Sequence, residues 1–198
     1  PEALPADLFT IVGPPKVLEN IEPAFIPMQA LGPGREMVYL NQVLGDLPDT
    51  DLPRAGSPVD RIFIVVLATP DREASIAWYC DRLALRRGED YTLPYSMINE
   101  AFGLAPDTQT TITMVSHGRM PIVEVDDYPD EAAPRARLDG KLPPGNALVT
   151  LAVEDLDDCT AEWLAPPSPR EGALYEGRRA ATAIGAGGEL VECVETGA

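Results

Sequence analysis

Short apolar runs alternate with polar, Pro- and Gly-rich stretches along the whole chain, a pattern typical of many short elements joined by turns. The longest run, Arg61–Leu67, is rich in β-branched and aromatic residues and predicts a buried strand. After it, Thr69 offers a helix N-cap and Pro70 suits the first helical position. The apolar residues that follow recur at helical spacing: Ile76, Tyr79, Cys80 and Leu83. We therefore expect a strand followed by a helix that packs one face on a sheet.

The middle of the chain continues with shorter elements. Arg87–Leu93 predicts a strand, and Ser96–Gly103 predicts a short helix that ends at its glycine. Thr110–Val115 and Ile122–Val125 predict two more strands, joined by a hairpin turn over 116–119. These elements follow the order strand, helix and three strands.

The last third of the chain shows a briefer version of the same order. Leu148–Val153 predicts a strand, and Asp155 can cap a helix that runs to Leu164. Arg178–Ile184 and Glu189–Glu195 predict a closing hairpin with a Gly-rich turn.

Two stretches repeat one another. Residues 30–40 (ALGPGREMVYL) and 183–193 (AIGAGGELVEC) share a small-apolar-Gly start, a Gly-rich turn, a glutamate and an alternating strand. Residues 59–79 and 147–164 share a strand followed by a helix. Repeated strand–helix openings and repeated hairpin endings indicate repeated structural units.

The repeats divide the chain into an N-terminal part and a paired part. Residues 1–57 hold the tail of a preceding unit and a linker, and residues 58–198 hold two complete units, 58–127 and 146–196. The linkers around these units are rich in Pro, Asp and Gly. Because the chain starts at Pro1 and with a partial unit, we expect a fragment of a longer chain. The unpaired strands of the tail predict a homodimer or a companion N-terminal fragment.

Composition narrows the classes of partner. The chain has 198 residues with 32 acidic and 15 basic side chains, so its formal charge of −17 opposes nucleic acids and anionic membranes. No apolar run approaches the ~20 residues that span a bilayer. The three cysteines are widely spaced and predict no disulfide framework, which favours a cytoplasmic protein.

Two motifs of the last unit resemble a known superfamily. IGAGGELVECVE (184–195) resembles the closing "DPDGNLIEL" hairpin of the glyoxalase/bleomycin-resistance/dioxygenase (vicinal-oxygen-chelate) superfamily, and VEDLDDCTAEW (153–163) resembles its "V-x-D-L-D" strand-to-helix step. The resemblance implies an α+β protein of tandem βαβββ units. The two units would form a curved eight-stranded mixed β-cup flanked by helices, preceded by the tail of another such unit.

The resemblance also implies where ligands of a metal would stand. Arg61 occupies the place of the first histidine, and no histidine lies near Leu148, the place of the second. Glu124 and Glu192 occupy the places of the two glutamates. The only histidine, His117, lies in the predicted hairpin turn, so we expect no cofactor, with a divalent metal on Glu124 and Glu192 as the alternative.

Three residues are candidate catalytic groups if the cup forms: Arg61, Glu124 and Glu192 would then converge within it. Glu192 lies between Leu190 and Val194 on one strand face, where it acts either as an acid–base group or as a structural ion-pair partner. Arg61 either pins the two carboxylates or binds an anionic ligand. The candidate substrate-binding residues are Arg61, Phe63, Tyr95 and Met97, of which Tyr95 and Met97 fit core packing equally well.

The sequence thus predicts a glyoxalase/bleomycin-resistance/dioxygenase-like protein that binds a small organic molecule in a β-cup without the usual His-ligated metal. One alternative is a metal-dependent lyase, isomerase or ring-cleaving dioxygenase that uses Glu124 and Glu192. A second alternative is a non-catalytic structural paralogue whose cup is filled by side chains.

Overall fold

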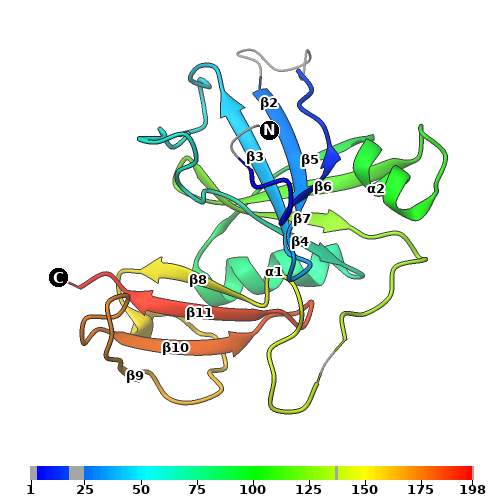
Figure 1. Cartoon of the computed structure of the whole chain (residues 1–198). Helices are drawn as coiled ribbons and strands as arrows, with labels where there is room; N and C mark the ends of the chain where they lie inside the picture. The colour runs from blue at the N-terminus through cyan, green and yellow to red at the C-terminus, as the bar shows by residue number, and fades with distance from the viewer. Residues whose placement is uncertain (1–3, 18–24, 137, 198) are drawn as a thin grey trace.

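The computed structural model describes residues 4–17, 25–136 and 138–197, and its strands form three separate sheets (Figure 1). Pro1 lies outside the described residues. The N-terminal sheet holds β1 (Thr10–Gly13), β2 (Phe25–Leu31) and β3 (Met37–Val43). The middle sheet holds β4 (Val65–Thr69), β5 (Arg86–Pro94), β6 (Gln109–His117) and β7 (Met120–Asp127). The C-terminal sheet holds β8 (Leu148–Val153), β9 (Ser168–Pro169), β10 (Arg179–Ile184) and β11 (Leu190–Glu195).

The middle and C-terminal sheets share one topology. Their strand orders are β4-β7-β6-β5 and β8-β11-β10-β9, so the first strand of each unit lies beside its last strand. That pair is parallel in both sheets, and the other pairs are antiparallel. Both units therefore have the strand arrangement of a βαβββ unit, and the α+β fold class is confirmed.

The helices of the middle unit form where the sequence predicts them. α1 spans Arg72–Leu83, and its N-cap is Asp71, whose carboxylate accepts a hydrogen bond from the Ala74 backbone N–H at 2.9 Å. The prediction of Thr69 as the cap was two residues early. α2 spans Ser96–Phe102 and ends at Gly103, which adopts a left-handed conformation (φ 64°).

The first strand of the middle unit begins later than predicted. β4 starts at Val65, so Arg61 and Phe63 precede it, and Arg61 is exposed with a left-handed φ of 60°. The parallel ladder pairs Val65 with Val123, which would place Pro121 opposite residue 63. Because proline has no backbone N–H to donate, the ladder stops before it reaches Phe63.

The helix predicted over 155–164 is also wrong. The structure has a single 3₁₀ turn, η1 (Leu156–Asp158), and Trp163 then bridges to Ala183 on β10. The intervening Thr160 binds the last turn of α1 through its backbone N–H (3.0 Å to the Arg82 carbonyl) and its hydroxyl. The segment after η1 is therefore bound to the end of α1, and this tertiary contact overrides local helix propensity.

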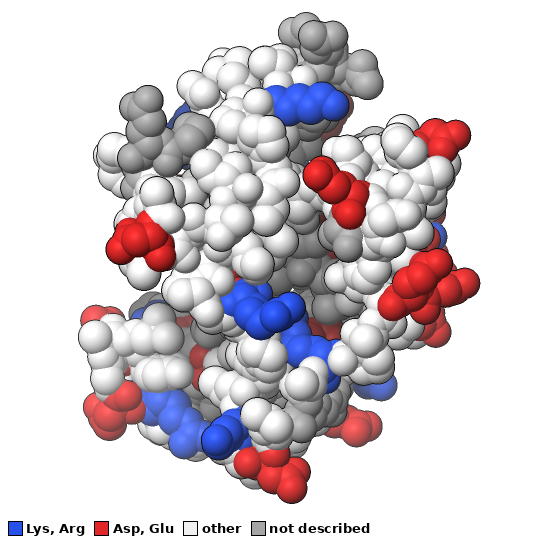
Figure 2. Space-filling model, turned by 45° about the vertical axis from the view of Figure 1, so that its right-hand side comes forward, with Lys and Arg blue, Asp and Glu red and all other residues white. Residues whose placement is uncertain are grey.

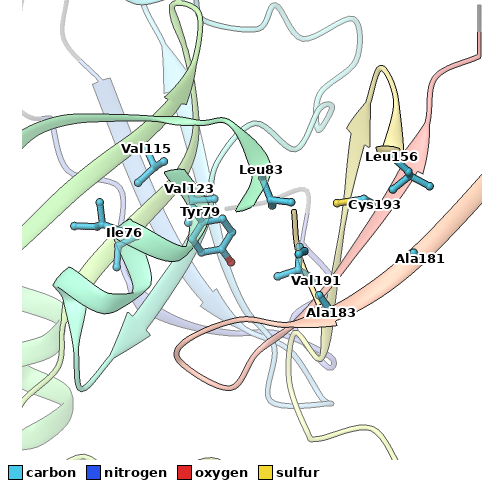
Figure 3. Packing of buried hydrophobic residues seen from close by; sticks show 12 residues of the cluster. Ile76, Tyr79, Leu83, Val115, Val123, Leu156, Ala181, Ala183, Val191 and Cys193 are labelled. Carbon is cyan, nitrogen blue, oxygen red and sulfur yellow. The ribbon is translucent and has the colours of Figure 1, made fainter. Parts of the chain in front are cut away.

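The main hydrophobic core places α1 between the middle and C-terminal sheets (Figure 3). On one side the helix meets buried valines of β6 and β7, and on the other it meets Val191 and Cys193 of β11. Tyr79 is 3% exposed, and its hydroxyl donates a 2.9 Å hydrogen bond to Glu189 in the last hairpin. The two four-stranded sheets thus share one helix as their common packing partner.

The hairpins that the sequence pairs as repeats have the same hydrogen bonds. The Gly32 N–H donates to the Glu36 carbonyl, and the Gly185 N–H donates to the Glu189 carbonyl, each at 2.9 Å. Within each turn a further backbone bond closes back on the first glycine, and the preceding Ala30 and Ala183 are both buried. Tyr39 and Glu192 therefore occupy equivalent positions, nine residues after those alanines.

The eight strands of the two complete units do not form one hydrogen-bonded sheet in the described part of the chain. The C-terminal sheet packs on the side of α1 away from the middle sheet, and the N-terminal sheet approaches the face of the middle sheet opposite to α1 (Figure 1). That face of the middle unit is thus paired with the partial N-terminal unit. Neither described α-helix is long and apolar enough to cross a membrane.

Candidate functional site

Two tyrosines and two carboxyl groups meet between the N-terminal and middle sheets. Tyr39 points from β3, and Tyr95 lies at the start of α2 and donates a 3.2 Å hydrogen bond to the Tyr39 hydroxyl. Glu124 and Asp126 lie two residues apart on β7 and so share one face of that strand. The negative charges of these carboxyl groups raise the pKa of both tyrosines, which places all four groups in one cluster.

Burial favours the protonated form of the carboxyl pair, Glu124 and Asp126. Burial raises the pKa of both groups, and the charge of Glu124 raises that of Asp126 further. The two carboxyl groups lie close enough to influence each other's protonation, so they titrate as a pair. Asp126 is 1% exposed, and its Oδ1 atom has no hydrogen-bond partner among the described residues.

The tyrosine pair, Tyr39 and Tyr95, provides neutral donors beside these carboxyl groups. Burial raises the pKa of Tyr39 to about 12, and burial together with the neighbouring Tyr39 raises the pKa of Tyr95 further. Both phenols therefore keep their protons at neutral pH. The cluster combines groups that exchange protons with groups that donate hydrogen bonds to a developing negative charge.

Of the predicted substrate-binding residues, Tyr95 lies in this cluster. The Met97 sulfur packs against Gly13 of β1, where an added Cβ would lie 3.3 Å away. Phe63 is half-buried and Arg61 exposed, both on the segment that precedes β4. The structure therefore does not place Arg61 inside the cup.

Glu192 lies elsewhere, in the C-terminal sheet. It accepts a 2.8 Å hydrogen bond from the Thr150 hydroxyl and a 3.1 Å hydrogen bond from the Tyr175 hydroxyl. It is 8% exposed and shares no partner with Glu124 among the described residues. The predicted convergence of Arg61, Glu124 and Glu192 is therefore not found, because the sheets of the two glutamates lie on opposite sides of α1.

These residues do not match the metal site that the family resemblance implies. Glu124 and Glu192 lie in different sheets, and no group of three His, Cys, Asp or Glu residues is placed to hold a metal in the part of the chain that the structure describes. His117 is exposed at the end of β6. We therefore derive no step that passes through a metal ion.

Sequence reasoning missed part of each cluster. Asp126 shares a strand face with Glu124, and the repeat aligned Tyr39 with Glu192, so both positions carried a signal. No pattern indicated that β3 would face β7, because tertiary packing determines which sheets lie against each other. Thr150 follows from its register opposite Glu192, whereas Tyr175 lies in a loop without periodicity.

Two of the pockets formed by the described residues are lined by residues other than the carboxyl pair. One of about 130 Å³ lies at the end of β7 and includes Asp127, next to Asp126 in the chain. The other, of about 260 Å³, lies on the C-terminal sheet. The tyrosine and carboxyl side chains between the N-terminal and middle sheets are mostly buried.

Comparison with solved structures identifies the fold. Glyoxalase I from Zea mays matches with a TM-score of 0.58 and 18% identity, covering 96% of this chain and 60% of the maize chain. A glyoxalase family protein from Bacillus cereus matches with a TM-score of 0.53 and 18% identity, covering 72% of this chain and 98% of that one. The chain thus spans about 60% of the length of the maize protein.

No protein-family model and no curated protein sequence matches the chain. At 18% identity the structural likeness defines the fold and leaves the activity open. The chain has the glyoxalase, or vicinal-oxygen-chelate, fold, as the motifs of the last hairpin predict.

Proposed function

Starting from this fold, we propose that the chain binds a small organic molecule between its N-terminal and middle sheets and exchanges a proton with it through Glu124 and Asp126. The observation that carries the proposal is the buried Asp126 Oδ1, which has no partner among the described residues beside two protonated tyrosines. A buried acceptor without a partner costs free energy, which a donor on a ligand would recover.

The chemistry that suits these groups is proton transfer next to a carbonyl. A carboxyl pair with raised pKa values contains both a base and an acid near neutral pH, so it can remove a proton from one atom and return it to another. The Tyr39 and Tyr95 hydroxyls then donate to the oxygen on which negative charge develops. The reaction class is an isomerase or a lyase, and sequestration without turnover uses the same contacts.

A thermal-shift screen of small hydroxycarbonyl compounds tests binding, because a ligand of the native state raises the melting temperature. A compound that binds at the cluster loses most of its shift in Asp126→Asn. The shift survives in the matched control Glu89→Gln, an exposed carboxyl on β5. Equal shifts in both variants would contradict binding at the carboxyl pair.

Metal analysis of the purified protein separates this function from the metal-dependent alternative. Stoichiometric divalent metal that is lost in Asp126→Asn would support metal-dependent chemistry and overturn the metal-free proposal. A protein with no metal and no ligand in the screen would support the non-catalytic alternative, in which the four side chains fill the cup.

We further infer that a strand from outside the described chain pairs with β3. In the two complete units the last strand, β7 or β11, lies beside a parallel first strand. The equivalent strand β3 has only β2 as a neighbour among the described residues. A second copy or a preceding stretch of chain would cover this edge, and sedimentation of the purified protein reports whether it is a dimer.

A further inference from the structure

The C-terminal sheet has one face in the core and one face that is open along β8 but covered at Glu192 and Val194 of β11. Alternation along β8 and β11 places Leu148, Thr150, Leu190 and Glu192 on the face opposite to the core residues Val191 and Cys193. On this open face Leu148 is 38% exposed and Ile184 of β10 is 45% exposed. Apolar residues grouped on an open sheet face are typical of a binding surface.

This face is hollowed by a pocket of about 260 Å³. Its walls come from the sheet and from the segments on either side of it. They consist of Leu142, Leu148, Leu164, Ala165, Ala181 and Leu190, with Thr182 and Arg170 as the polar members. Since one water molecule takes roughly 30 Å³ of liquid, the volume suits a molecule of about ten non-hydrogen atoms.

Arg170 brings a positive charge to the pocket. Its side chain makes no hydrogen bond or ion pair with the described residues, whereas Arg72, Arg87 and Arg179 are all paired with carboxylates. Figure 2 shows Lys and Arg side chains gathered on the lower half of the molecule, the half that holds β8–β11 in Figure 1. In a chain of formal charge −17, an unpaired guanidinium at an apolar pocket matches an anionic ligand.

The loop that carries Arg170 is held in place by Glu192. Backbone hydrogen bonds join Arg170 to Arg178 (3.0 Å) and to Gly177 (2.9 Å) across the loop. Tyr175, within the same loop, donates its hydroxyl to Glu192 at 3.1 Å. Glu192 thereby acts as a positioning residue that fixes the loop over the sheet.

We propose that this pocket binds a small apolar carboxylate, with its hydrocarbon part against the leucines and its carboxylate on Arg170. The site is separate from the carboxyl pair, since α1 and the middle sheet lie between them. Binding here neither requires nor excludes proton transfer between the other two sheets.

Titration calorimetry with octanoate tests the proposal, with octanol as the uncharged comparison. We expect saturable binding of octanoate that weakens roughly fivefold to tenfold in Arg170→Gln, the cost of one charge-assisted hydrogen bond. Lys16→Gln removes the same charge from an exposed position outside the pocket and leaves the affinity unchanged. Octanol binds more weakly, and its affinity does not change in Arg170→Gln.

Leu148→Glu provides a second variant, because it puts a negative charge on the pocket wall at a partly exposed position that the fold tolerates. It should abolish octanoate binding while the melting temperature stays close to that of the unaltered protein. Undetectable octanoate binding to the unaltered protein, or equal affinities in the Arg170→Gln and Lys16→Gln variants, overturns the proposal. A dimer that Leu148→Glu separates, with no octanoate bound, also overturns it and assigns the face to a second copy.

Discussion

Tyr39 and Glu192 occupy equivalent positions in two copies of the same hairpin, yet their surroundings differ. Tyr39 faces the middle sheet, where it meets Tyr95 and lies beside the carboxyl pair. Glu192 faces away from the core, where it accepts hydrogen bonds from Thr150 and from the loop residue Tyr175. One face is closed by a second sheet, and the other is open beside a pocket. The hairpin repeat sets the position of the side chain on its strand, and the sheet that packs against that strand sets the surroundings of the side chain.

The largest effect is expected when the glutamate of the last hairpin is placed at the equivalent position of the N-terminal hairpin. Tyr39→Glu would add a third acid beside Glu124 and Asp126, and we expect it to lower the free energy of unfolding by about 3 to 5 kcal/mol at neutral pH. Urea unfolding measures the loss. Tyr91→Glu makes the same change at a tyrosine of β5 that is 50% exposed, and should cost less than about 1 kcal/mol. Equal losses would show that the Tyr39 environment is not enclosed.

A smaller effect is expected in the pH dependence of the free energy of unfolding. The raised pKa values of the carboxyl pair mean that its protonated form is favoured in the folded state. This stabilisation is complete below the pKa of an unfolded carboxyl and is lost as the pH rises through the raised values. Asp126→Asn should remove the share of this dependence that belongs to Asp126, so the difference in unfolding free energy from the unaltered protein changes by about 1 to 3 kcal/mol between acidic and mildly alkaline pH.

Denaturant unfolding at several pH values provides that measurement. Taking the difference between proteins removes the opposite contribution of Glu73, Asp90 and Glu195, whose pKa values are lowered by hydrogen bonds to Arg87, Thr113 and Arg179, respectively. A difference that is constant with pH would show that the carboxyl pair titrates normally.

The smallest predicted effect compares two hydroxyl groups. Tyr95→Phe removes a hydrogen bond between mostly buried phenols and should cost about 1 kcal/mol, because Tyr39 then loses its partner. Tyr175→Phe removes the bond to Glu192 from a loop at the open face and should cost less than Tyr95→Phe. Thermal unfolding of both variants ranks them, and the reverse order would contradict the assignment of closed and open faces.

Local patterns predicted individual strands and hairpins well. The Gly-rich turns and the alternation along 190–195 yield the last hairpin nearly residue for residue, because these signals depend on neighbours in the sequence. The run 61–67 predicted too early a start for the strand, because its β-branched residues carry no information about Pro121, which lies opposite in a distant strand. The helix expected over 155–164 failed for a similar reason, since Thr160 binds α1 of another unit.

The site was predictable only in part. Glu124 and Glu192 were found through the family motif, and both are largely buried acids. Their convergence assumed that the two complete units close around one hollow. In the structure the partial N-terminal unit, and not the last unit, faces the middle sheet. Which of two similar units faces the middle sheet depends on tertiary packing between the sheets.

The position of α1 between two sheets also bears on how the chain can be shortened. Ile76, Tyr79 and Leu83 are each less than a tenth exposed, and Val191 and Cys193 of the last unit lie in the same cluster (Figure 3). Truncation before β8 would remove the sheet that covers one side of this helix and would expose its apolar side chains to water. A shortened version would therefore aggregate, and the last unit is an integral part of the molecule, not an appendage.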